Sequence, residues 1–72
     1  MSPPSVIGCS GTIIVATRGA GGPGEVLVSV AGGTEAYLAW SEQPLPVGTV
    51  VAVYETRGER TVDVVELPGS AP

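Results

Sequence analysis

The segment from Gly19 to Gly24, GAGGPG, has the spacing G-x-G-x-x-G that binds dinucleotide phosphates in other proteins. That spacing works when its last residues open a helix whose backbone amides hold the pyrophosphate. Here Pro23 has no amide hydrogen, and the valine-rich run after Gly24 predicts a strand rather than a helix. We therefore interpret the segment as a flexible hairpin loop and expect no cofactor.

Cys9 is the single cysteine of the chain, and it lacks the partners that a thiol needs for chemistry. A nucleophilic thiol requires a base beside it, but the sequence contains no histidine and no lysine. The serines at positions 10, 29 and 41 lack a base for the same reason. One thiol with scattered carboxylates is also not a ligand set for a structural metal. We expect no catalytic residue and no metal site.

The seven carboxylates offer the remaining route to catalysis. Acid–base work by carboxylates requires a pair in a cleft, with the pKa of one member raised, and a barrel of this size has little room for a cleft. We interpret the carboxylates as solvated charges that keep strand edges from pairing. They are Glu25, Glu35, Glu42, Glu55, Glu59, Asp63 and Glu66. The sequence therefore predicts a protein that is not an enzyme.

The charge of the chain weighs against nucleic acid as a partner. The net charge is −4, and the only basic residues are Arg18, Arg57 and Arg60. Proteins that bind nucleic acid neutralise several phosphates with Lys and Arg, whereas the field of this chain repels a phosphate backbone. The same argument weighs against an anionic membrane surface.

The N-terminal sequence MSPPSVIGCS has no basic region and no long apolar run, so it does not resemble a signal peptide. No apolar stretch approaches the ~20 residues that a transmembrane helix needs. A free cysteine without an export signal favours the cytoplasm.

Five apolar runs separated by Gly and Pro predict five short strands in a small all-β barrel with no regular helix. The expected strands are Gly11–Thr17, Glu25–Val30, Thr34–Ser41, Thr49–Thr56 and Glu59–Leu67. The predicted organisation is a flexible N-terminal tail over residues 1–10, an antiparallel barrel over residues 11–67 and a flexible C-terminal tail over residues 68–72. Two prolines in the loop 42–48 exclude a regular helix there. We expect Leu45 of that loop to cover one end of the barrel.

The pair Gly32-Gly33 is a typical two-residue turn between the second and third strands. With that turn as the loop, Val28 lies opposite Tyr37 and Leu27 lies opposite Leu38.

The pair Arg57-Gly58 predicts a second turn of the same kind. It places Val53 opposite Val62, and it places Glu55 opposite Arg60 as an exposed pair of opposite charges.

The first hairpin has two apolar faces, and a closed barrel buries only one. One face carries the mainly β-branched set of Val26, Val28, Val30, Tyr37 and Ala39. The other carries Leu27, Leu38 and Trp40. If the β-branched set fills the interior, the second set forms an exposed surface of the kind that binds a partner. The alternative is that a bulge lets both faces contribute to the core, with Trp40 closing a barrel end.

Three elements of the sequence resemble the soluble C-terminal domain of NfeD-like proteins. The run Gly24–Val28 precedes a glycine turn and Tyr37–Ala39, like that family's strand-turn-strand with aromatic-x-alanine. Pro46–Thr49 followed by alternating valines is similar to its strand with proline/lysine-glycine-threonine. Gly58 before a valine-rich last strand is similar to its closing hairpin.

The resemblance implies a five-stranded OB-type barrel, similar to the short free-standing versions seen in actinobacteria. It also implies an adaptor that associates with SPFH (stomatin/flotillin-type) membrane scaffold proteins, and it carries over no catalytic residue.

We predict a protein-binding module that contacts its partner through Leu27, Leu38, Trp40 and Tyr54. The partner is an SPFH-type scaffold or a second copy of this chain, and the chain is cytoplasmic or recruited to the membrane through its partner. Two alternatives stay open, an OB-fold domain that binds single-stranded nucleic acid and a self-assembling structural subunit.

Overall fold

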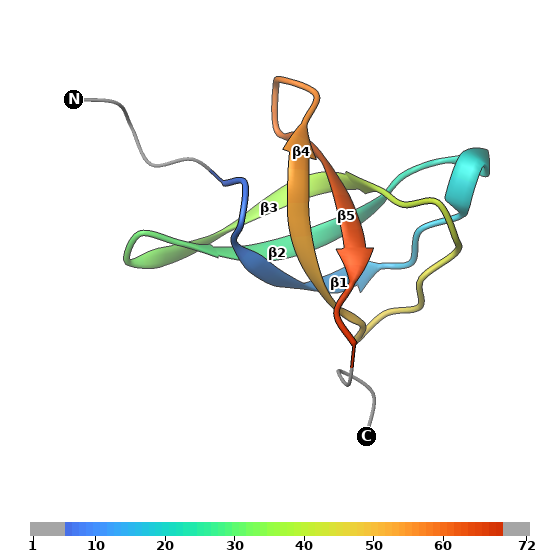
Figure 1. Cartoon of the computed structure of the whole chain (residues 1–72), viewed down its shortest axis with the longest axis horizontal. Coiled ribbons are helices and arrows are strands. Elements are labelled where there is room, and N and C mark those ends of the chain that lie inside the picture. Colours follow the sequence, from blue (N-terminus) through green and yellow to red (C-terminus); the bar gives the residue numbers. More distant parts are fainter. Residues whose placement is uncertain (1–5, 69–72) are drawn as a thin grey trace.

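The computed structural model describes residues 6–68, which form a closed five-stranded barrel (Figure 1). The strands are β1 (Ser10–Val15), β2 (Gly24–Val30), β3 (Gly33–Trp40), β4 (Val50–Thr56) and β5 (Thr61–Glu66). Around the barrel they follow the order β1-β2-β3-β5-β4, and β1 closes it by pairing with β4. Within residues 6–68 the single helical element is the three-residue 3-10 turn η1 (Gly19–Gly21). The predicted all-β barrel without a regular helix is confirmed.

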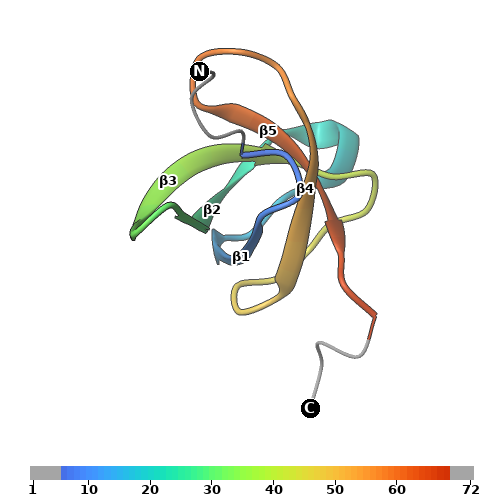
Figure 2. The same cartoon turned by 60° about the vertical axis from the view of Figure 1, so that its left-hand side comes forward.

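One pair of neighbouring strands departs from the antiparallel pattern. β3 and β5 run parallel, whereas the other four neighbouring pairs are antiparallel. The two hairpins β2–β3 and β4–β5 point in different directions (Figures 1 and 2), and the 41–49 segment carries the chain from one to the other. The parts of the predicted tails in residues 1–5 and 69–72 lie outside the described residues. Between residues 6 and 68 no helix is long and apolar enough to cross a membrane.

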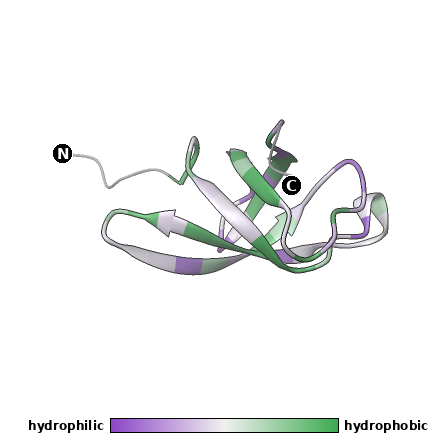
Figure 3. Cartoon of the chain, turned by 90° about the horizontal axis from the view of Figure 1, so that it is seen from below, coloured by the Kyte–Doolittle hydropathy of each residue, from purple (hydrophilic) through white to green (hydrophobic). Residues whose placement is uncertain are grey.

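The interior is filled by β-branched side chains that alternate along the strands, as the period of a strand requires. The strongly hydrophobic positions accordingly lie along the strands (Figure 3). The buried hydrophobic residues are Ile13, Val26, Val28, Ala39, Leu45, Val51, Val53, Val62 and Val64.

The β1–β2 contact is too close for a side chain at Gly11. A Cβ on Gly11 would lie 2.6 Å from the carbonyl oxygen of Leu27, a distance that real Cβ atoms do not show. A bulge between Ile13 and Val15 then shifts the register of β1 against β2. Close approach and a bulge together bend β1, so that it can pair with β2 on one side and β4 on the other.

The turn between β2 and β3 is formed by Ala31 and Gly32, not by the predicted pair Gly32-Gly33. Both residues have positive φ, 30° and 88°, as a type I′ hairpin turn requires. Val30 therefore pairs with Gly33, and the predicted register is wrong by two residues. A shift of two residues leaves each side chain on its predicted face.

The turn between β4 and β5 is longer than predicted. Arg57 N–H donates to the Thr61 carbonyl at 2.8 Å, which leaves three residues in the loop, and Arg60 takes the left-handed conformation at φ 55°. A bulge after Val53 shifts the register again. The predicted facing pair Glu55–Arg60 is therefore wrong, because Glu55 lies opposite Asp63.

Leu45 closes one end of the barrel, as predicted, and a buried threonine holds it there. The Leu45 side chain is 7 % exposed and packs in the core. The Leu45 amide donates to Thr17 Oγ1 at 2.8 Å, and the Thr17 amide donates to the Leu45 carbonyl at 3.0 Å. Thr17 Oγ1 also lies 2.6 Å from Ser41 Oγ, which joins the ends of β1 and β3 to this loop. This end of the barrel is therefore closed by Leu45 and by the hydrogen bonds of Thr17, not by a helix.

Candidate protein-binding surface

Leu27 and Leu38 lie on the outer face of the β2–β3 hairpin. Their side chains are 38 % and 44 % exposed. Leu27 pairs with Ala36, and Leu38 pairs with Glu25, so the two leucines are diagonal neighbours on one face. On the inner face Val26, Val28 and Ala39 are 0 % exposed. Of the two arrangements considered from the sequence, the β-branched set is therefore the one that fills the interior.

Trp40 continues the outer face of β3 but is half-buried. The guanidinium of Arg57 lies over its indole ring, 4.9 Å from the ring centroid. Arg57 Nη2 also lies 2.9 Å from Asp63 Oδ1, and Asp63 is the residue that pairs with Trp40 across the β3–β5 ladder. Arg57 is thus held by a ring and a carboxylate at once, and it covers part of the indole.

Arg60 makes a similar arrangement with other partners. Its guanidinium lies 5.4 Å from the centroid of Tyr37, and its Nη2 lies 2.9 Å from Glu35 Oε1. The Arg60 and Glu35 side chains are 63 % and 50 % exposed, whereas that of Asp63 is only 14 % exposed. Two of the three basic residues of the chain are therefore already paired with carboxylates.

Tyr54 lies on β4, so β5 separates it from Trp40 on β3. It lies within the bulge of β4, with its side chain 51 % exposed. Tyr54 and Trp40 line one hollow of about 520 Å³, whose walls also include Arg57 and Asp63. The predicted residues thus form a stripe of three on β2 and β3, with Tyr54 joined to it through this hollow. We call these four residues the apolar surface.

Sequence reasoning missed one apolar residue in this region. Val15 is 47 % exposed and pairs with Glu25, which in turn pairs with Leu38, so the apolar stripe extends onto β1. The β1 bulge after Ile13 changes which side chains of the strand point outward, and nothing in the sequence marks its position. The cover that Arg57 and Asp63 provide for Trp40 was missed as well, because it depends on the longer turn of the second hairpin.

The other residues considered from the sequence lie outside the apolar surface. The GAGGPG segment contains η1 and leads directly into β2 at Gly24, so its last glycine opens a strand. The side chain of Cys9 is half-buried. Across residues 6–68 there is no group of three or more His, Cys, Asp or Glu residues that could hold a metal ion.

The comparisons with known proteins agree with this architecture. The model of the NfeD C-terminal domain family matches residues 10–65. This chain belongs to the NfeD C-terminal domain family. Its fold is similar to that of the soluble domain of the NfeD protein YuaF from Bacillus subtilis, solved in solution, with a TM-score of 0.72 and 30 % sequence identity. That similarity covers 85 % of this chain and 73 % of the other. Among curated proteins, none matches the chain.

Proposed function

We propose that this NfeD-family barrel is a non-enzymatic adaptor that binds a protein partner through the apolar surface. The partner is an SPFH (stomatin/flotillin-type) membrane scaffold protein, and the adaptor works in the cytoplasm or is recruited to the membrane by that partner. The observation that carries the proposal is the exposure of Leu27 and Leu38, at 38 % and 44 %, on a face whose interior side is already filled by valines. These leucines are not needed to fill the barrel.

The position of Trp40 supports the same conclusion. Interface hot spots are enriched in tryptophan and arginine near the centre of the contact. Here Trp40 and Arg57 are stacked beside Leu38 on one face. Association of NfeD-like proteins with SPFH scaffolds, implied by the resemblance described above, supports the identity of the partner.

Binding of single-stranded nucleic acid has less support. Such proteins combine a basic groove with aromatic side chains on which bases stack. Trp40 and Tyr37 are present, but the guanidinium over each ring is paired with Asp63 or Glu35. A phosphate would have to compete with these carboxylates and with a net charge of −4.

The test is a co-purification of the tagged full chain with the stomatin/flotillin-type protein encoded in the same genome. We expect capture by the wild type and a loss of at least ten-fold in Leu38→Ser, because the substitution places a hydroxyl in the centre of the apolar surface. Val47→Ser is the matched control, because Val47 is an exposed aliphatic residue, 63 % exposed, in the loop between β3 and β4.

Trp40→Ala provides a second variant. Truncation of a central indole costs more than about 2 kcal/mol of binding, or roughly thirty-fold in affinity. A thermal melt shows whether the variant is folded. Equal capture by the wild type, Leu38→Ser and folded Trp40→Ala would contradict the proposal.

A further inference from the structure

Strand β5 extends beyond its neighbour β3. The parallel ladder runs from Leu38–Thr61 to Trp40–Asp63 and then stops, because β3 ends at Trp40. β5 continues to Glu66, still paired with β4 on its other side through Val51. The phase of this ladder, in which the Leu38 amide donates to the Arg60 carbonyl, makes the Val64 N–H the last group of β5 that bonds to β3. The Val64 carbonyl and residues 65–66 therefore lie at a strand edge that β3 does not cover.

The backbone of Glu66 faces this edge. The Leu67 amide donates to the carbonyl of Val50, the first residue of β4, at 3.0 Å. Successive amides of a strand point to opposite sides, so the Glu66 N–H points away from β4. In the described part of the chain no backbone hydrogen bond joins Glu66 to the 41–45 loop. An uncovered row of backbone donors and acceptors is a template for an added strand.

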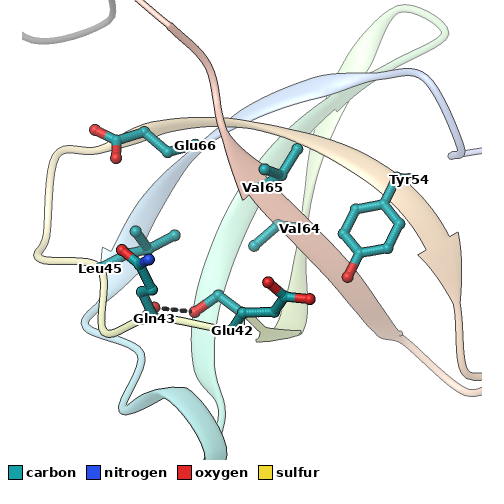
Figure 4. A pocket seen from close by; sticks show the side chains of 8 residues that line it. Glu42, Gln43, Leu45, Tyr54, Val64, Val65 and Glu66 are labelled. Atoms are coloured by element: carbon teal, nitrogen blue, oxygen red, sulfur yellow. Dashed lines mark hydrogen bonds between the residues drawn. The ribbon is translucent and has the colours of Figure 1, made fainter.

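A hollow of about 490 Å³ lies along this edge (Figure 4). The side chains of the loop between β3 and β4 stand on one side of it, and those of β4 and β5 stand on the other. Leu45 and Val64 line it with buried aliphatic surface, and Tyr54 and Val65 line it with side chains that are each 51 % exposed. The hollow can therefore take an aliphatic side chain of a strand that lies along β5.

The charges around the hollow are negative. The carboxylates of Glu42 and Glu66 both line it, and no basic residue does. Within residues 6–68 the ion pairs are those of Arg57 with Asp63 and of Arg60 with Glu35, so neither Glu42 nor Glu66 is neutralised by a basic side chain. An occupant that carries a Lys or Arg side chain would complement these two carboxylates.

We propose that the free edge of β5 binds an extended, basic peptide segment of a partner protein as an added strand. Its backbone pairs with the N–H and C=O of Glu66 and with the C=O of Val64. An aliphatic side chain enters the hollow against Leu45, and a basic side chain faces Glu42. This site adjoins the hollow beside Trp40, because Ser41, Glu42 and Tyr54 line both. The identity of its occupant does not depend on the proposed SPFH partner.

The test uses a fluorescent hexapeptide of sequence SVRVTV with the ¹⁵N-labelled full chain. We expect saturable binding, with amide shifts concentrated in residues 41–45 and 64–66. The peptide SVEVTV, in which glutamate replaces the arginine, is the matched control and should bind at least ten-fold more weakly. Absence of binding by SVRVTV, equal binding of both peptides, or shifts centred on Leu27 and Leu38 would overturn the proposal.

Variants at Glu66 separate the backbone contribution from the charge. Glu66→Gln removes the carboxylate alone and should weaken binding about three-fold. Glu66→Pro also removes the edge-facing N–H without removing a hydrogen bond to β4, and it should weaken binding at least ten-fold. Binding of Glu66→Pro with wild-type affinity would contradict strand addition.

A peptide-side test remains decisive if Glu66→Pro does not fold. Two forms of SVRVTV are N-methylated at alternate residues, in complementary patterns. In an added strand only one set of amides faces β5, so one pattern should abolish binding and the other should preserve it. Equal behaviour of the two patterns would refute strand addition. Leu38→Ser should bind SVRVTV normally, so failure here and failure of SPFH capture are distinguishable.

Discussion

The two faces of the β2–β3 hairpin are both apolar, yet they differ in what surrounds them. On the inner face Val26, Val28 and Ala39 are completely buried. Leu27, the adjacent residue, is 38 % exposed on the outside. Hydrophobicity alone does not distinguish these faces, because leucine is as apolar as valine. Side-chain shape does, since β-branched residues fill the narrow interior of a small barrel and leave the longer leucines outside.

This difference separates stability from binding within one hairpin. A barrel of this size has a small core, so each inner valine carries a large share of the roughly 3–5 kcal/mol of net stability that such scaffolds have. The outer leucines, 38 % and 44 % exposed, should contribute less to folding than the inner valines, and their exposed surface is available for a partner. Substitutions on the two faces should therefore have different consequences.

The largest effect is expected for Val28→Ala. The substitution removes two methyl groups from a completely buried site, at about 0.8 kcal/mol for each buried carbon plus a cavity term. We expect the free energy of unfolding to fall by about 2 kcal/mol, measured by urea titration of the full chain.

Leu27→Ala is the matched control on the opposite face of the same strand. It removes more carbon atoms, but from a site 38 % exposed, so the loss should stay below about 1 kcal/mol. If Leu27→Ala cost as much as Val28→Ala, the outer face would belong to the core and the comparison would fail.

The face of each residue could be predicted from the sequence, whereas the register could not. Strand alternation assigned Val26 and Leu27 to opposite sides, and an error of two residues in the first turn preserved that assignment. The turn itself was misplaced because Ala31 takes a positive φ, 30°, that is uncommon for alanine. The glycine pair beside it was the stronger sequence signal for a turn.

The second hairpin shows where sequence reasoning ends. The bulge after Val53 and the left-handed Arg60 add residues that counting from Arg57-Gly58 cannot detect. As a result the predicted pair Glu55–Arg60 is replaced by two contacts to β3, one from Arg57 to Trp40 and one from Arg60 to Tyr37. Both contacts form because β3 and β5 lie side by side as parallel neighbours. Turn patterns within a short stretch of sequence do not predict that pairing.

A smaller effect is expected for Arg57→Ala, which tests whether Arg57 covers Trp40 on the outer face. It removes a cation from Trp40 and leaves Asp63, 14 % exposed, without its ion-pair partner. We expect a loss of up to about 1 kcal/mol of stability. Because Trp40 is the single tryptophan, acrylamide quenching of its fluorescence should increase as the indole loses its cover.

Arg60→Ala removes the same side chain from the exposed pair with Glu35 and is the control. It should cost less than about 0.5 kcal/mol, since exposed ion pairs contribute little, and it should leave the quenching of Trp40 unchanged. Equal quenching in the two variants would mean that Arg57 does not cover Trp40 in solution.

The smallest effect is expected when single-stranded DNA or RNA is added to the wild type. The outer face carries Trp40 with the guanidinium of Arg57 over its ring, and an aromatic ring beside a basic group is a component of a base-stacking platform. In this barrel, however, Arg57 and Arg60 are held by carboxylates, and the chain carries a net charge of −4. We expect no change in Trp40 fluorescence on titration with a mixed-sequence oligonucleotide at moderate salt. Low salt is the informative second condition, because binding through phosphates strengthens steeply as salt falls. Micromolar binding that weakens with added salt would assign the outer face to nucleic acid. The inner face would then serve folding, and the outer face would serve nucleic-acid recognition rather than protein binding.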